Sequence, residues 1–300
     1  MAFEKTGLNY AKEYSQALAQ AYPYTLYFGA LWSATKDVKF LNSNTVILPS
    51  LSVKGRGNGD RDSIGSFSRN FNNHEESKTL KTHRTWDTLI HPRDIDETNH
   101  VASIQNITKV MNEEQKFPEM DAEMITALYA LKNAIENITE DEVLDVANVL
   151  TKFDAMMDKM DEARVPAAGR LLYADTYTKT LIDTAKEAAR TLAATDKVVA
   201  RSIERIGEVE IIGVPTSVMK SAFNLKAEDG FEVAADAKDV KMLLVHPSAV
   251  IPVIAYDFAE LGAPSSLSKG KWTYFEESFE DVFIFDKKHN AIQFYIEQTA

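Results

Sequence analysis

The chain has 300 residues, of which 45% are hydrophobic and 26% are charged, and its formal net charge is −12. This composition supports a sizeable core and excludes a wholly disordered chain, and the acidic balance argues against tight binding to nucleic-acid phosphates. The absence of cysteine excludes disulfides and thiolate metal sites. Near the start, the longest apolar stretch (residues 21–32) is too short to span a bilayer, so we expect a soluble protein with no membrane partner.

Residues 1–43 are predicted to form an N-terminal arm. Apolar residues recur every three or four positions from Leu8 to Ala21, as in an amphipathic helix, and Pro23 ends that pattern. A dense aromatic cluster follows, and a cluster of this kind needs burial. We predict that a neighbouring subunit buries it, through the residues Tyr24, Tyr27, Phe28 and Trp32. The alternative is that the arm packs on its own domain.

Residues 44–93 are predicted to form an extended loop, a projecting β-hairpin. Residues 45–53 are strand-like, a glycine-rich tip and an asparagine-rich turn region follow, and residues 78–86 alternate as a second strand. A hairpin with so few core residues needs another surface for its stability. From Ser52 to Arg84 it carries seven basic and four acidic residues, a net charge of +3.

The next part of the chain, residues 97–162, is strongly acidic, with five basic and fifteen acidic residues and therefore a net charge of −10. A basic hairpin and an acidic body in one sequence favour packing between copies of the chain. We therefore predict intersubunit contacts for the basic loop residues Lys54, Arg56, Arg61 and Arg69. The alternative is that both charged regions are simply exposed to water.

Helices and then mixed elements are predicted along the rest of the chain. A stripe of apolar residues indicates a long helix that begins near Pro118, and the capping-box spacing of Thr139 and Glu142 predicts the start of a second helix. Strands are expected at 170–174, 208–214 and 240–245, helices at 176–192 and from Pro247 to Leu261, and an apolar β-hairpin at 282–296. The predicted fold class is α+β.

Motifs of known chemistry are missing from the sequence. The glycines at 55, 57 and 59 lack the Gly-Lys-Ser/Thr ending of a phosphate loop, the six histidines show no zinc-type spacing, and there is no Gly-x-Ser-x-Gly motif. We therefore predict no catalytic residues, no cofactor and no metal. A stand-alone α+β enzyme, with a site assembled from distant residues, remains an alternative.

Five stretches, in this order, resemble the major capsid proteins of tailed bacteriophages, whose shell fold is named after bacteriophage Hong Kong 97. The first ends in Asp94-x-x-Glu97-Thr98, similar to the exit of the family's extended loop, and the second reads Pro118-Glu-Met-Asp-Ala122, similar to the start of its spine helix. The others are residues 164–173, 206–215 and 246–250. Together they span most of residues 44–296.

The resemblance implies a capsid shell fold with four parts: the N-terminal arm (1–43), the extended loop (44–93), a peripheral domain with a long spine helix (94–137 and 262–300) and an axial domain (138–261). It also implies self-assembly into hexamers and pentamers of an icosahedral shell around double-stranded DNA. Such a shell would be part of the virion and would assemble in the host bacterial cytoplasm.

Further partners follow from the same resemblance: a portal protein, decoration proteins and a separate scaffolding protein, because no long scaffolding segment precedes the arm. The DNA is expected to be enclosed without tight binding. A related alternative is an encapsulin-like compartment, which shares the fold and packages protein cargo. The covalent lysine–asparagine crosslink of some relatives is not expected, because no local motif matches it.

Overall fold

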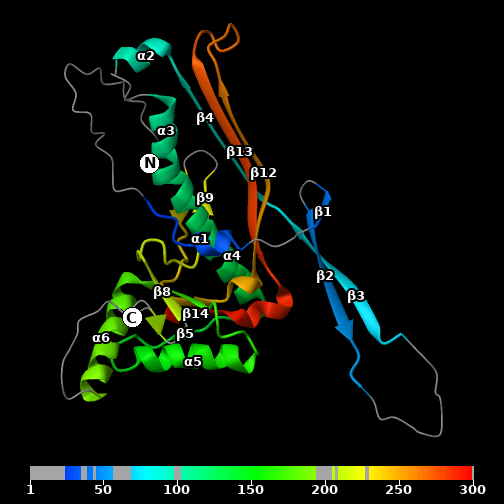
Figure 1. The fold of residues 1–300 in the computed structure, drawn as a ribbon, viewed down its shortest axis with the longest axis vertical. Coiled ribbons are helices and arrows are strands. Elements are labelled where there is room, and N and C mark those ends of the chain that lie inside the picture. Colours follow the sequence, from blue (N-terminus) through cyan, green and yellow to red (C-terminus); the bar gives the residue numbers. More distant parts are fainter. Residues whose placement is uncertain are drawn as a thin grey trace.

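The computed structural model describes residues 24–34, 39–42, 45–56, 69–97, 103–193, 205–206, 209–226 and 230–298. Figure 1 shows a body of packed helices and strands, a long helix beside a long narrow sheet, and a projection of strands that leaves the body. Helices combine with mostly antiparallel sheets, so the predicted α+β class is confirmed.

A six-stranded sheet forms the centre of the body within the described residues. Its order is β5 (Glu140–Asp141), β14 (Ile292–Glu297), β11 (Val240–Val245), β6 (Leu171–Asp175), β8 (Val209–Val214) and β7 (Arg205–Ile206). β6 and β8 are parallel and are joined through α6 (Thr176–Ala193), while β11 pairs antiparallel with both of its neighbours. The predicted strands at 170–174, 208–214 and 240–245 and the helix at 176–192 are confirmed.

The predicted long helix is present, and a further helical segment precedes it. The helical run consists of α3 (Ile104–Met111), a π-helical turn η1 (Asn112–Lys116) and α4 (Phe117–Ile135), which follow one another without a break. Pro118 therefore lies inside the helical run. Proline lacks the N–H that an α-helix needs, but here the preceding Phe117 N–H already bonds five residues back, to the Asn112 carbonyl. The wider turn accommodates the proline, so α4 begins at Phe117, as predicted near Pro118, while the helical run as a whole starts earlier, at Ile104.

A three-stranded antiparallel sheet runs beside this helix (Figure 1), in the order β12 (Val250–Gly262), β13 (Trp272–Ile284) and β4 (Thr82–Ile90). The predicted helix from Pro247 to Leu261 was wrong, because only the 3₁₀ turn η2 (Pro247–Ala249) precedes β12. The β-branched run around Pro252 suits a strand, and β12 is an edge strand, where proline costs no ladder hydrogen bond.

The projection is a sheet of β1 (Lys39–Asn42), β2 (Thr45–Val53) and β3 (Phe71–Thr79), and β3 is followed almost directly by β4. The extended hairpin is thus present, but its returning strand begins at Phe71, with Val53 opposite Phe71 and Thr45 opposite Thr79. The asparagine-rich stretch predicted as a turn region lies in β3, because pairing with β2 satisfies its backbone. α2 (Pro92–Glu97) follows β4.

Two further local predictions failed. The strands expected as an apolar C-terminal hairpin lie in different sheets, because the 3₁₀ turn η3 (Asp286–Ala291) redirects the chain from β13 to β14, whose partner is β11. The Thr139–Glu142 capping box starts no helix, since β5 pairs with β14 there and α5 (Val149–Glu162) begins later. The remaining short elements are α1 (Gly29–Trp32), β9 (Phe223–Leu225) and β10 (Phe231–Val233).

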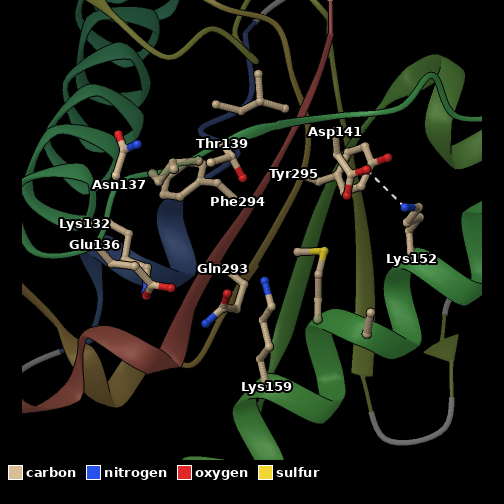
Figure 2. A pocket seen from close by; sticks show the side chains of 14 residues that line it. Lys132, Glu136, Asn137, Thr139, Asp141, Lys152, Lys159, Gln293, Phe294 and Tyr295 are labelled. Carbon is tan, nitrogen blue, oxygen red and sulfur yellow. Dashed lines mark hydrogen bonds and ion pairs between the residues drawn. The ribbon is translucent and has the colours of Figure 1, made fainter.

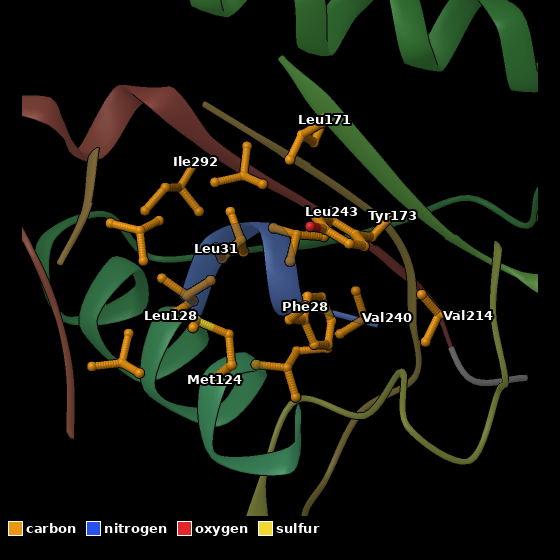
Figure 3. Packing of buried hydrophobic residues seen from close by; sticks show 14 of the residues in the cluster. Phe28, Leu31, Met124, Leu128, Leu171, Tyr173, Val214, Val240, Leu243 and Ile292 are labelled. Atoms are coloured by element: carbon orange, nitrogen blue, oxygen red, sulfur yellow. The ribbon is translucent and has the colours of Figure 1, made fainter. Parts of the chain in front are cut away.

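The main core lies between α4 and the central sheet. Figure 3 shows Phe28 and Leu31, at α1, inserted between Met124 and Leu128 of α4 and strand residues such as Leu243. A second core lies between the sheet and α5 and α6, around Phe153, Met160 and Ile182. The first core therefore holds the N-terminal segment and the long helix on the same sheet.

Candidate assembly interface

The base of the extended loop is packed on its own chain. Val46, Leu48 and Leu80 are buried against residues of β12 and β13. Two lysines add polar contacts: Lys78 pairs with Asp286 of η3 at 3.0 Å, and the ammonium of Lys287 donates to the Leu51 carbonyl at 3.1 Å. These contacts fix the direction in which the loop leaves the body.

The distal half of the loop has no such cover. Leu51, Val53 and Phe71 are 59%, 68% and 53% exposed, and all described residues from Arg69 to Glu75 are exposed. Apolar side chains gathered at the end of a projecting strand pair are typical of a surface that another molecule covers. The sequence analysis predicted the basic residues of the loop and not this apolar group. The alternation of Leu51 and Val53 in β2 was the signal that could have revealed it.

The predicted basic contact residues lie at this exposed end. Lys54 and Arg56 are exposed just beyond β2, and the Lys54 N–H donates to the Asn70 carbonyl at 2.8 Å, which closes the strand pair. The Arg69 guanidinium lies 4.9 Å from the centre of the Phe71 ring, a cation–π contact. Arg61 lies outside the described residues. The structure thus brings positive charge and apolar surface together at the loop's end.

The aromatic cluster of the arm packs on its own chain instead. Phe28 is fully buried, with its ring centre 4.6 Å from that of Tyr173, so it has no free surface for a neighbouring subunit. The Trp32 indole N–H donates to the Met120 carbonyl at 3.4 Å. Tyr24 and Tyr27 pack beside them, and an intersubunit contact stays a prediction only for Tyr24, Tyr27 and Trp32.

Asp121 anchors this segment to the long helix and was missed by the sequence reading. Its carboxylate accepts hydrogen bonds from the Tyr24 hydroxyl at 2.8 Å, from the Tyr27 N–H at 2.9 Å and from the Phe28 N–H at 3.0 Å. Burial raises the pKa of Asp121 to about 6, although these three donors oppose the rise. An acidic residue inside an apolar stripe was the available signal.

The acidic segment 97–162 is not one uniform surface. Four acids of α5 (Asp154, Asp158, Asp161 and Glu162) are exposed, whereas Asp121 and Glu123 of α4 are buried. Asp161 binds the fully buried Arg170, whose guanidinium also donates to the carbonyls of Val165 and Pro166. The exposed negative charge of this segment therefore includes the outer side of α5.

A small pocket lies between the end of α4, the start of α5 and β14, with a volume of about 130 Å³. Figure 2 shows its charged lining residues, several of which pair with each other: Lys132 with Glu136, and Lys152 with Asp141. Ligand pockets are typically about 300–1,000 Å³. The size and the internal pairing of the charges give this pocket no evident chemistry.

The described residues contain neither a candidate membrane-spanning helix nor a candidate metal-binding cluster. No helix in the part of the chain that the structure describes is long and apolar enough to cross a membrane. The same residues contain no group of three or more His, Asp or Glu side chains placed to hold a metal ion.

Comparison with known proteins identifies the fold. No protein-family model and no curated relative matches the sequence. Solved structures do: the capsid of cyanophage P-SCSP1u has a TM-score of 0.71 at 10% identity, over 98% of this chain and 96% of that chain.

Two further structures agree. The mature capsid of bacteriophage PhiM1 has a TM-score of 0.67 at 11% identity over 97% of this chain and 93% of that one, and a structure from Mycobacterium phage Che8 has 0.62 at 12% over 97% and 98%. Identity this low shows similarity of fold. The resemblance seen in the sequence is thereby confirmed for the fold: the chain has the shell fold of phage capsid proteins.

Proposed function

We propose that this chain is the major capsid protein of a tailed bacteriophage, a structural subunit without enzymatic activity that self-assembles into the shell of the virion. One observation carries the proposal: the match to phage capsid structures extends over nearly the whole length of both chains, 98% and 96% for the cyanophage capsid. A shared small domain would match over only part of the chain. Because the structural match includes the projecting loop and the long helix, it favours the same structural role for this chain.

The finer features of the proposal come from the resemblance of the sequence to the family. They are hexamers and pentamers in an icosahedral shell around double-stranded DNA, assembly in the host cytoplasm, and partners that include a scaffolding protein, a portal and decoration proteins. We keep the division into an arm (1–43), a loop (44–93), a peripheral domain (94–137 and 262–300) and an axial domain (138–261) as part of this proposal.

The extended loop is the proposed contact between subunits. Its base is held on its own chain, while its distal half exposes Leu51, Val53 and Phe71 beside Lys54, Arg56 and Arg69. Covering this apolar surface by a neighbour stabilises the association, and the bases favour an acidic partner surface. Since the chain as a whole has a net charge of −12, another copy offers such a surface.

The decisive experiment removes the end of the loop. Residues 54–70 are replaced by Asn-Gly, a turn that suits two-residue hairpins and leaves the opposed pair Val53 and Phe71 in register. Since the cores lie elsewhere, we expect an unchanged melting temperature and a loss of regular particles in negative-stain microscopy, with and without a scaffolding protein. A second variant replaces residues 54–56 by Ser-Gly-Ser, which removes two of the proposed contact bases and keeps the length of the loop, so it separates the effect of charge from that of loop length.

Three outcomes distinguish the role of the loop, the shell proposal and the kind of shell. Regular particles from the shortened variant would show that the loop is not required between subunits. A wild-type protein that stays a small oligomer under all assembly conditions would contradict the shell proposal itself. If particles from a natural source contain protein cargo and no DNA, the chain serves an encapsulin-like compartment.

A further inference from the structure

The interface between the long helix and the three-stranded sheet is built from acidic side chains. On β13, Glu276, Ser278 and Glu280 are buried, while the alternate residues are more exposed. Residues that alternate along a strand share a face. The buried face is the one toward the helix, because Glu276 binds Lys116 of η1, and Arg84, opposite Ser278 on β4, binds Glu119 of α4.

Two of these carboxylates are well compensated. Glu119 accepts from Arg84 Nε at 2.6 Å and from Nη2 at 3.0 Å, a two-pronged ion pair. Glu276 accepts from the Lys116 ammonium at 3.1 Å and from the Tyr274 hydroxyl at 2.8 Å. Arg84 and Lys116 are thereby engaged with the carboxylates of Glu119 and Glu276.

The two inner carboxyls lack this compensation. Glu123 of α4 and Glu280 of β13 are 7% and 5% exposed, and neither forms an ion pair within the described residues. Glu123 Oε1 is buried without a hydrogen-bond partner, and Thr82 of β4 provides a hydrogen bond to the same carboxyl group. A buried carboxylate that is neither paired nor fully hydrogen-bonded is strongly disfavoured in its charged form.

The surrounding charges make ionisation of this pair harder still. Glu280, Asp281 and Glu119 repel a charge on Glu123, and Glu119 and Asp257 repel a charge on Glu280, whereas Lys116 and Arg84 attract it. Burial, as the largest cause, raises the pKa of Glu123 to about 9 and that of Glu280 to about 7. The two groups interact, so they lose their protons as a coupled pair.

We propose that Glu123 and Glu280 form a proton-operated latch between α4 and β13. With Glu123 protonated, the helix lies closed on the sheet; when both carboxyls are charged, their repulsion and their need for water loosen the contact. The latch belongs to the single subunit and does not depend on the proposed shell. Its consequence is a change in how firmly the long helix holds the sheet that carries β4, and with it the extended loop.

The direction of the pH effect follows from the raised pKa values. A carboxyl that holds its proton more tightly in the folded state stabilises the fold at low pH, and this stabilisation is lost as the pH rises through the folded pKa. Protonated Glu280 stabilises the fold up to about pH 7, and protonated Glu123 stabilises it up to about pH 9. From pH 7 to 9 the remaining change therefore comes mainly from Glu123, which keeps its proton to higher pH than Glu280.

The test compares the full chain with Glu123→Gln by urea unfolding from pH 7 to 9. For wild type, the unfolding equilibrium constant is expected to rise by up to about tenfold per pH unit, the limit for one proton. Glu123→Gln should reduce this rise to less than about twofold. Glu280→Gln removes the negative charge that repels a charge on Glu123. Glu123 then loses its proton at a lower pH, so the unfolding equilibrium constant should stop rising at a lower pH. The exposed Glu162→Gln is the matched control and should behave as wild type.

Amide hydrogen exchange tests whether the pH effect is located at the contact between α4 and β13. Between pH 8 and 10, amides of residues 117–135 and 272–284 should exchange faster than the intrinsic rate predicts in wild type and not in Glu123→Gln. An equal pH slope in wild type and Glu123→Gln would overturn the latch. An altered slope without local exchange in these two segments would also overturn it, because the proton would then act on stability alone. If Glu123→Gln fails to fold, Glu280→Gln with its shifted end point still decides.

Discussion

Truncating Phe28 tests whether the N-terminal aromatic cluster belongs to its own subunit. The side chain is fully buried between α4 and the central sheet, against Tyr173. Phe28→Ala leaves a cavity there, and substitutions of this kind cost about 3–5 kcal/mol of unfolding free energy. Phe28→Leu removes three carbons, which at about 0.8 kcal/mol each amounts to about 2 kcal/mol.

The assay is urea unfolding of unassembled protein, followed by tryptophan fluorescence at several protein concentrations. The matched control is Phe71→Ala, because Phe71 is half-exposed at the end of the loop and its loss should cost less than about 1 kcal/mol. Since Phe28 is buried by its own chain, its cost should not depend on protein concentration.

Two results would refute the reasoning. A loss for Phe28→Ala as small as that for Phe71→Ala would mean that Phe28 is not in the core. A loss that grows with protein concentration would mean that a neighbouring subunit buries Phe28, the arrangement originally predicted from the sequence.

Three further predictions concern charge. Arg56→Glu combined with Arg69→Glu should slow assembly, and wild-type assembly should weaken with salt because exposed pairs are screened, whereas Lys109→Glu, an exposed control outside the loop, should have little effect; light scattering measures both. Unassembled subunits should not shift duplex DNA at physiological salt, with a dissociation constant weaker than about 10⁻⁴ M, because 45 acids outnumber 33 bases; a micromolar affinity in a gel-shift assay would contradict this. Arg170→Met should cost about 2–3 kcal/mol in urea unfolding, because the carbonyls of Val165 and Pro166 and the Asp161 carboxylate lose the donors of the fully buried Arg170, and a cost below about 1 kcal/mol would contradict that.

The sequence pattern alone predicts an element correctly where the surroundings of its side chains repeat along that element. β11 consists almost entirely of apolar residues because it lies between two strands with helices over the sheet, and such a strand is visible as a short apolar run. The existence of the long helix was equally visible in its apolar stripe. Its start at Ile104 was not, because a π turn lets the helix pass Pro118, and the pattern around a proline predicts an end.

Some segments could satisfy their backbone hydrogen bonds either as a helix or as a strand. For these, strands from far along the chain determined which structure formed. Residues 250–262 have enough apolar positions for a helix, but pairing with β13 along nearly their whole length makes them a strand. The same competition separates β13 from β14, which adjoin in the sequence and belong to different sheets.

Periodicity and motif order were enough to predict the α+β class, the projecting basic hairpin, most central strands and the shell fold. The role of the acidic residues, in contrast, depends on how distant segments pack. Asp121 and Glu123 count equally with Asp154 and Asp158 in a charge sum, yet the first two lie in the interior. Asp121 is held by the Tyr27 and Phe28 amides, and a charge on Glu123 is repelled by Glu280. A carboxyl's charge depends on its distance from water and on the groups around it, and some of those groups, such as the Tyr27 amide for Asp121 and Glu280 for Glu123, come from segments far away in the chain.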